Sequence, residues 1–117
     1  MELGGRVALV TGAGRRVGRA IALGLAAKAM RIAVHYHASS DEAEESVRLA
    51  RAAGAPDAWS ARADLRDTAA ITRLVNGVVE RGGALDVLVN SAAEMRKTPF
   101  DSVSPGEWDD IMALNMR

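Results

Sequence analysis

The sequence predicts an α/β fold in which a doubly wound parallel sheet of about four strands carries helices on both faces. Short apolar runs alternate along the chain with segments whose apolar residues recur at helical spacing, a pattern typical of βαβ units. A glycine-rich turn at residues 11–18 joins the first apolar run to the first helical segment. The last helical segment still continues at residue 117. We therefore expect residues 1–117 to be the N-terminal part of a single domain, incomplete at its C-terminus.

Four apolar runs are expected to be strands, because a buried parallel strand presents apolar residues to both of its faces. The runs lie at residues 7–10, 32–34, 58–63 and 87–89. The third has the weakest pattern, around Trp59 and Ala61, and we interpret Trp59 as a packing residue.

Four segments are expected to be helices, the first from Arg16 onward. The others have recognised start signals. These are Ser39, Ser40 or Asp41 for the second helix, Asp67 or Thr68 for the third, and Ser104-Pro105-Gly106-Glu107 for the last. Gly54 should end the second helix after Ala53, and Gly82-Gly83 should end the third. A polar loop is expected at residues 94–104.

Composition excludes several classes of protein. The chain has 15 basic and 15 acidic side chains, four aromatic residues and no cysteine. A net charge of zero argues against a nucleic-acid partner, and the lack of cysteine excludes a disulfide framework. The longest uncharged apolar stretch, residues 20–27, is too short to span a membrane. With no signal peptide visible at the N-terminus, we expect a cytoplasmic protein.

The charge is nevertheless unevenly distributed along the chain. Residues 1–40 carry a net charge of +5 and residues 41–117 a net charge of −5. Such asymmetry is typical of a site for an anion. The alternative is a set of solvated arginines on helix faces.

The glycine-rich turn has the features of a phosphate-binding turn. Gly12 permits a tight turn, Gly14 permits close approach of the backbone to a ligand, and Gly18 permits close packing of helix and sheet. The helix that follows would present free N–H groups and a partial positive charge to a pyrophosphate. A glycine-rich turn without a ligand is the alternative.

This turn is similar to that of the short-chain dehydrogenase/reductase family, and the resemblance extends from about residue 5 to residue 117. Residues 11–18 match the family's Thr-Gly-x-x-x-Gly-x-Gly turn, except that Arg16 replaces the middle glycine. Asp64 and Leu65 resemble the segment after the third strand, where the family's Asp contacts the adenine. The resemblance implies an NAD(P)-binding Rossmann domain.

Two further segments carry the resemblance. Residues 90–93 resemble the family's Asn-Asn-Ala-Gly, with Ser91 and Ala93 as departures. Near the end of the chain, Asn115 matches the asparagine that the family uses structurally and in catalysis.

Arg16 and the run His35-Tyr36-His37 are similar to the pteridine reductase branch of the family, in which the arginine reaches cofactor phosphate and substrate. A merely tolerated, solvent-facing Arg16 is the alternative. Met95 departs from the branch, because an aromatic residue often stacks on the pterin there. His35 and His37 lack a third ligand for a metal site, so we expect no metal.

The sequence favours NADP(H) over NAD(H). An NAD-binding chain usually has an acidic residue near the end of the second strand, where this chain has Tyr36. A 2′-phosphate could accept charge-assisted hydrogen bonds from Arg15 and His37. Hydroxyl hydrogen bonds from Ser39 and Ser40 could be added. The expected cofactor-binding residues are Gly12, Gly14, Arg15, Arg16, Val17, Gly18, Tyr36, His37, Ser39, Asp64, Leu65, Asn90 and Ala92.

The family's hydride transfer also requires a serine and a Tyr-x-x-x-Lys motif, in which the tyrosine exchanges a proton with the substrate. The only tyrosine of this chain is Tyr36, and residue 40 is serine rather than lysine. Of the family's catalytic tetrad, only Asn115 is present. We expect an isolated chain to be inactive and its parent enzyme, a dimer or tetramer, to reduce a carbonyl or imine of a small molecule, such as a pteridine. A non-catalytic dinucleotide-binding module is the alternative.

Overall fold

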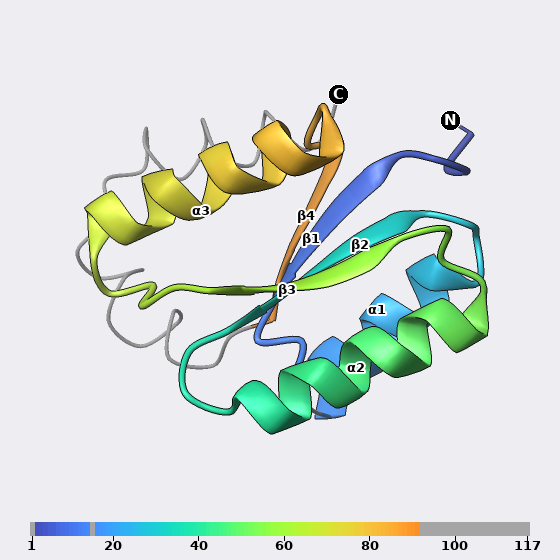
Figure 1. Cartoon of the computed structure of the whole chain (residues 1–117), viewed down its shortest axis with the longest axis horizontal. Helices are drawn as coiled ribbons and strands as arrows, with labels where there is room; N and C mark the ends of the chain where they lie inside the picture. The colour runs from blue at the N-terminus through green and yellow to red at the C-terminus, as the bar shows by residue number, and fades with distance from the viewer. Residues whose placement is uncertain (1, 15, 92–117) are drawn as a thin grey trace.

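The computed structural model describes residues 2–14 and 16–91. Strands and helices alternate along this part of the chain (Figure 1). The elements are β1 (Val7–Thr11), α1 (Arg16–Ala26), β2 (Arg31–Tyr36), α2 (Ser40–Ala53), β3 (Ala58–Arg62), α3 (Thr68–Gly82) and β4 (Val87–Asn90). The expected loop at 94–104 and the expected helix from Ser104 lie outside the described residues.

The four strands form one parallel sheet in the order β3-β2-β1-β4. This is the strand order of the first half of a doubly wound dinucleotide-binding fold. Thr11 pairs with Asn90, and Tyr36 pairs with Arg62. The carboxyl ends of all four strands therefore meet at one edge of the sheet.

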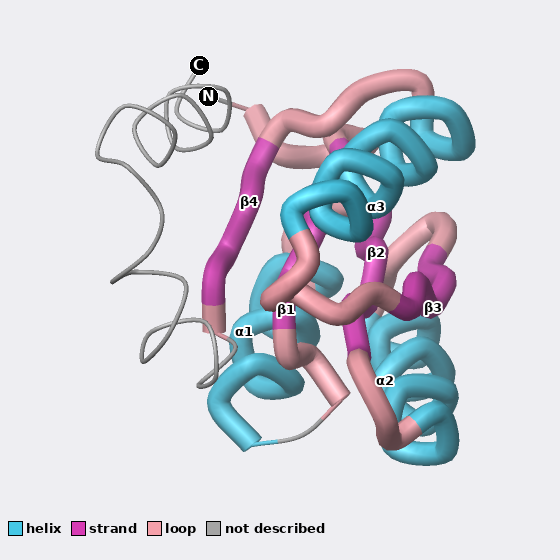
Figure 2. Tube along the Cα trace, turned by 90° about the vertical axis from the view of Figure 1, so that its left-hand side faces the viewer, coloured by secondary structure: helices cyan, strands magenta, loops and turns pink. Residues whose placement is uncertain are grey.

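Helices cover both faces of the sheet, with α1 and α2 on one face and α3 on the other (Figures 1 and 2). Alanine dominates the core under α1 and α2, with Ala22, Ala26, Ala43 and Ala50 fully buried. Such small side chains let these helices approach the strands closely. Under α3 the core contains larger side chains. Among them is Trp59, which is 8% exposed and packs in the core as expected.

The helix termini follow the sequence signals with one exception. The side chain of Asp67 accepts a hydrogen bond from the N–H of Ala69, which confirms it as the N-cap of α3. Gly83, with a φ of 84°, ends that helix. Ser39 precedes α2, but its side chain makes no capping hydrogen bond. Ser39 is therefore the N-cap residue, as the sequence allowed, but without the expected hydrogen bond from its hydroxyl.

Candidate functional site: the glycine-rich turn at the carboxyl edge of the sheet

The glycine-rich turn leaves the carboxyl end of β1 and enters α1. Gly12 has a φ of 62°, a left-handed conformation that glycine adopts without steric cost and that allows the tight turn expected there. The first turn of α1 contains no acidic residue. An acidic side chain in that turn would offset the positive end of the helix, and α1 has none there.

Gly18 permits α1 to pass directly over the start of the turn. A Cβ atom at this position would lie 2.3 Å from the carbonyl oxygen of Gly12 and 2.7 Å from the Oγ of Ser91. The backbone oxygen cannot move aside without rebuilding the turn. Gly18 is therefore required by close packing, as the sequence predicted. At Gly14 a Cβ would meet only ordinary contacts, the nearest at 3.6 Å.

Two exposed side chains stand at the N-terminus of α1. Arg16 is a non-glycine residue with a φ of 51°, a conformation that costs a non-glycine residue about 1–2 kcal/mol. Strain of this kind gathers at functional sites. Beside it, Val17 is 68% exposed, an unusual exposure for a large apolar side chain.

The end of β2 holds the turn from one side. The N–H of Gly12 donates to Nδ1 of His35 at 3.0 Å, and the N–H of Ala13 donates to the carbonyl oxygen of His35 at 3.1 Å. The Nε2 atom of His35 lies 2.9 Å from the carbonyl oxygen of Ala63. His35 thereby joins the turn to the segment that leaves β3.

The end of β4 holds the turn from the other side. The Thr11 hydroxyl lies 3.2 Å from the carbonyl oxygen of Val89 and 3.0 Å from Oδ1 of Asn90. It also accepts a hydrogen bond of 3.0 Å from the N–H of Ser91. The Ser91 hydroxyl donates in turn to the carbonyl oxygen of Thr11. Ser91, a departure from the family's asparagine, thus joins the two strands.

Side chains from both α1 and α2 hold the carbonyl groups of the turn. The Ser46 hydroxyl, which is fully buried, donates to the carbonyl oxygen of Ala13 at 2.7 Å. The Arg19 guanidinium donates to the carbonyl oxygen of Gly14 at 2.7 Å and to Ser46 at 2.8 Å. These hydrogen bonds fix the carbonyl groups of Ala13 and Gly14 and so define the shape of the turn. The Arg19 guanidinium also places a positive charge close to the turn.

The residues predicted to bind the cofactor did not include His35, Ser46 or Arg19. These three contact the backbone of the turn from β2, α2 and α1 respectively, and their signal in the sequence is weak. A polar residue inside an otherwise apolar strand or helix face was the available sign, because buried polar groups need partners. His35 and Ser46 both fit that description.

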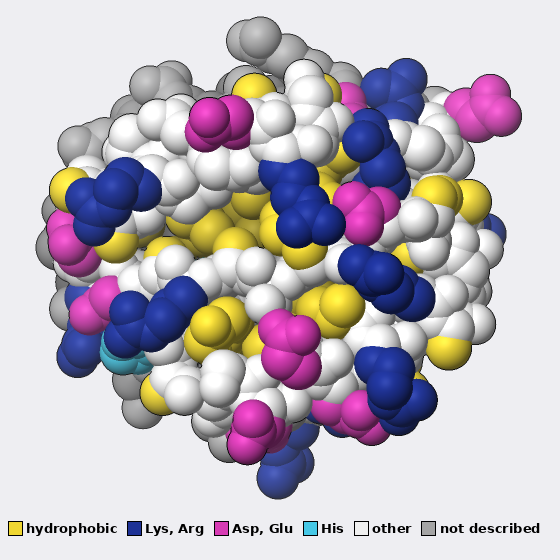
Figure 3. Space-filling model, in the orientation of Figure 1, with side chains coloured by type: hydrophobic (Ala, Val, Ile, Leu, Met, Phe, Trp, Pro, Cys, Tyr) yellow, Lys and Arg dark blue, Asp and Glu magenta, His cyan; other side chains and the backbone are white. Residues whose placement is uncertain are grey.

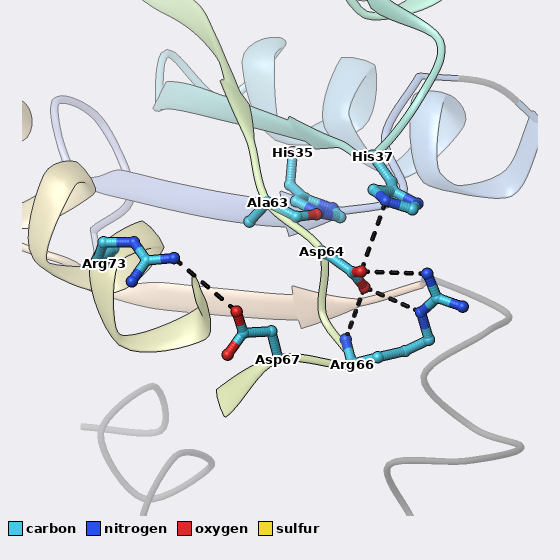
Figure 4. Close-up of polar contacts among 7 residues, drawn as sticks. All are labelled: His35, His37, Ala63, Asp64, Arg66, Asp67 and Arg73. Atoms are coloured by element: carbon cyan, nitrogen blue, oxygen red, sulfur yellow. Dashed lines mark hydrogen bonds and ion pairs between the residues drawn. The ribbon is translucent and has the colours of Figure 1, made fainter. Parts of the chain in front are cut away.

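A second cluster of polar side chains lies beside the turn, where β2 and β3 end (Figure 4). Nε2 of His37 lies 3.8 Å from Oδ2 of Asp64. Arg66 approaches Asp64 with its Nε at 3.0 Å, and the N–H of Arg66 also donates to Oδ1 at 3.0 Å. These hydrogen bonds from Arg66 are the main cause that lowers the pKa of Asp64 to about 2. Asp64 is thus an anion held at the expected adenine side.

The flank of α3 forms a different kind of surface. A hollow of about 580 Å³ lies between β3 and α3, with apolar side chains on its floor and arginines at its rim (Figure 3). Arg81 stacks over the ring of Trp59 at 4.6 Å and lies 3.4 Å from Oδ1 of Asp57. The rim charges are therefore already paired in part.

Comparison with known proteins decides the family. The sequence profile of the family "short chain dehydrogenase" matches residues 6–117. The chain belongs to the short-chain dehydrogenase family. It is 38% identical over 110 residues to the 3-oxoacyl-[acyl-carrier-protein] reductase FabG of Staphylococcus aureus, covering 94% of this chain and 44% of that protein. It is also 38% identical over 116 residues to versicolorin reductase stcU of Emericella nidulans, covering 99% of this chain and 44% of the relative.

A solved structure agrees with this assignment. A Burkholderia cenocepacia protein with bound NADP superimposes with a TM-score of 0.75 at 35% identity, covering 93% of this chain and 42% of that one. The chain thus spans less than half the length of the relatives that it matches. These three are named as a 3-oxoacyl-[acyl-carrier-protein] reductase, a versicolorin reductase and a putative dehydrogenase, and none of the three is named as a pteridine reductase.

The left-handed φ of Arg16 is the conformation that glycine tolerates best. It falls at the position where the sequence resemblance places a glycine of the family's turn.

The structure brings most of the predicted cofactor residues to one edge of the sheet. Gly12, Gly14, Arg16, Val17 and Gly18 form the turn, whereas Tyr36, His37, Ser39, Asp64 and Asn90 lie at or after the ends of β2, β3 and β4. Leu65 differs, because it is 8% exposed and packs in the core under α3. Arg15, Ala92 and Asn115 lie outside the described residues.

Within residues 2–14 and 16–91, no helix is both long and apolar enough to cross a membrane. In the same part of the chain, no group of three or more His, Asp or Glu side chains is placed to hold a metal ion.

Proposed function

We propose that this chain is the cofactor-binding part of an NADP(H)-dependent oxidoreductase that reduces a ketone of a small molecule. The observation that carries this proposal is the turn itself. Its backbone is fixed by β2, β4 and α2, and Gly18 is sterically required. At the same time the N-terminus of α1 presents Arg16 and Val17 to solvent.

The arrangement suits a dinucleotide. A pyrophosphate at the N-terminus of α1 would meet the helix dipole and the guanidinium of Arg16. Val17 would cover the apolar part of the ligand, which accounts for its exposure. The bound nicotinamide supplies or accepts the hydride, and the protein supplies binding and orientation.

Support for NADP(H) comes from the surroundings of His37. This side chain is 44% exposed at the end of β2, where an NAD-specific chain carries an acid. Asp64 is the nearby anion, but Arg66 forms hydrogen bonds to both of its oxygens. A 2′-phosphate would therefore meet a neutral or basic surface. The Burkholderia protein named above, which holds NADP, gives independent support.

A ketone is the substrate that the relatives favour, since one is named for a 3-oxoacyl substrate. The pteridine hypothesis depended on Arg16 and on His35-Tyr36-His37. His35 is 3% exposed and its ring faces Gly12 and Ala63, so it has no open path to a substrate. Arg16 and the exposed His37 remain as features that favour a pteridine. Turnover of a 3-oxoacyl thioester and of a dihydropteridine by the complete gene product would distinguish the two.

Binding of NADPH and NADH to the complete gene product tests the cofactor assignment. We expect NADPH to bind about tenfold more tightly, which is the worth of one charge-assisted hydrogen bond. Arg15→Glu should weaken NADPH more than NADH. Equal losses for the two cofactors would contradict the assignment.

The non-catalytic module remains the second candidate, because the described residues include no Tyr-x-x-x-Lys motif. The two candidates differ in turnover. Tight NADPH binding without oxidation of NADPH by any ketone or pteridine would favour the module. We also expect the complete enzyme to be a dimer or tetramer in the cytoplasm.

A further inference from the structure

His35 occupies an unusual place for an ionisable side chain. It lies in β2, inside the sheet, and is 3% exposed. Its ring extends between two backbone groups that belong to different parts of the cofactor site. One is the N–H of Gly12 in the phosphate turn, and the other is the carbonyl of Ala63, which directly precedes Asp64.

These two partners fix the protonation pattern of the ring. A backbone N–H can only donate, so Nδ1 must present its lone pair to Gly12. A backbone carbonyl can only accept, so Nε2 must carry the hydrogen that faces Ala63. The neutral Nε2–H form satisfies both partners, whereas a proton on Nδ1 would place two donors opposite each other at 3.0 Å.

We propose that His35 is a positioning residue that sets the phosphate turn against the Ala63–Asp64 segment and so holds the two halves of the cofactor site in register. This inference rests on the proposed function, because its consequence is read in cofactor binding. The dinucleotide would span both parts, and its affinity depends on how well the empty site is organised beforehand. His35 does this without touching the cofactor.

The backbone of His35 supports the same role. Its carbonyl oxygen accepts the N–H of Ala13 at 3.1 Å, and the next carbonyl, that of Tyr36, accepts the N–H of Ala63 at 3.0 Å. Backbone bonds alone therefore tie β2 to both segments. The ring adds a direct connection between these segments, which only a side chain with a donor at one end and an acceptor at the other can make.

The test compares His35→Asn with His35→Leu in the complete gene product. Both replacements shorten the side chain to a similar size, but only asparagine keeps an acceptor near the N–H of Gly12. We expect His35→Leu to weaken NADPH binding about tenfold, since it leaves the part-buried N–H of Gly12 without this partner. His35→Asn should recover only part of that loss, because it restores the partner of Gly12 but not the connection to Ala63.

Asp86→Ala is the matched control, because Asp86 accepts the N–H of Val7 at 2.9 Å at the opposite end of β1. It should lower the thermal midpoint and leave the NADPH affinity unchanged. If Asp86→Ala weakens NADPH as much as His35→Leu does, or if His35→Asn is as weak as His35→Leu, the positioning role is refuted. Should His35→Leu fail to fold, His35→Asn should still bind NADPH more weakly than Asp86→Ala does, and equal affinities of these two variants would refute the positioning role.

A second readout does not depend on the cofactor. Hydrogen exchange of the Gly12 amide should be slow in the wild type and in His35→Asn and fast in His35→Leu. Unchanged exchange in His35→Leu would overturn the inference even if NADPH binds. If the wild type binds neither NADPH nor NADH but the exchange pattern holds, the proposed function fails while the connection made by His35 stands.

Discussion

The two ends of the sheet both use polar side chains to hold backbone, yet they leave different surfaces. At the amino ends, Asp86 accepts the N–H of Val7 at 2.9 Å and donates its own N–H to the carbonyl of Val7 at 2.9 Å. Arg6 completes this closed group with an ion pair to Asp86 at 3.4 Å. At the amino end, these polar groups of Arg6, Val7 and Asp86 are therefore paired with one another.

At the carboxyl ends, side chains also form hydrogen bonds to the backbone, but not every side chain there is paired or buried. His35, Ser46 and Arg19 hold the turn from the protein side. The opposite side of the turn presents the N-terminus of α1 with Arg16 and Val17 exposed. Among the described residues, the turn thus combines a backbone held by hydrogen bonds with two exposed side chains at a helix N-terminus, as a preorganised anion site requires.

The largest effect is expected from adding a single methyl group at the carboxyl end. Gly18→Ala would place a Cβ 2.3 Å from the carbonyl oxygen of Gly12. We expect the free energy of unfolding to fall by about 3 kcal/mol and NADPH binding to be lost. Chemical denaturation and fluorescence titration measure the two effects.

Gly24→Ala provides the control within the same helix. A Cβ there meets nothing within 4 Å, so helix propensity should raise the stability by about 0.5–1 kcal/mol. A loss of stability in Gly24→Ala as large as that in Gly18→Ala would show that the close approach at Gly18 is not the cause.

The next effect separates stability from binding at the amino end. Asp86→Ala leaves the N–H of Val7 without its carboxylate partner, so the free energy of unfolding should fall by about 1–2 kcal/mol. The NADPH affinity should not change, because the site lies at the far end of the strand. Weaker NADPH binding in this variant would mean that the two ends are not independent.

A smaller effect tests the strain at Arg16. Arg16→Gly removes the cost of a left-handed φ but adds the chain entropy of glycine, so we expect a net gain in stability of about 0.5–1 kcal/mol. NADPH binding should weaken because the guanidinium is lost. Thermal unfolding and the NADPH dissociation constant report the two changes.

Ala29, with a φ of 63° in the turn before β2, offers the matched replacement at the amino end. Ala29→Gly should give a similar gain in stability without any change in NADPH affinity. If Arg16→Gly also leaves the affinity unchanged, Arg16 is only a tolerated surface residue.

The smallest effect concerns the pKa of Asp64. Hydrogen bonds from Arg66 lower this pKa from 3.8 to about 2. Because the pKa is lower in the folded state, the contribution of Asp64 to stability is present above about pH 4 and is lost as the pH falls through about 2. In Arg66→Ala the pKa should return toward 3.8, as an NMR titration of the carboxyl would show. An unchanged pKa would point to another cause, such as His37.

Much of the fold could be predicted from the sequence because its signals are local. The alternation of apolar runs with helical spacing indicated the seven described elements, and Asp67 and Gly83 mark the ends of α3 as their residue types suggest. Ser39 shows the limit of such signals. Its residue type favours a cap, but the side chain makes no capping hydrogen bond.

The candidate site was predicted in outline only. Gly12 and Gly18 follow from a motif, but the role of His35 depends on which strand lies beside β1 and which way the ring faces. The left-handed φ of Arg16 is likewise a property of the folded turn. Periodicity and composition contain neither kind of information, because both arise from contacts between distant segments.

The most direct test of the central claim maps NADPH onto the two ends of the sheet. Backbone amide resonances of the isotopically labelled gene product would be followed during a titration with NADPH. We predict large shifts for Gly14, Val17 and Gly18 and for Asp64, with no change at Val7 and Asp86. Shifts at Val7 and Asp86 without shifts in the turn, or no shifts at saturating NADPH, would contradict the account.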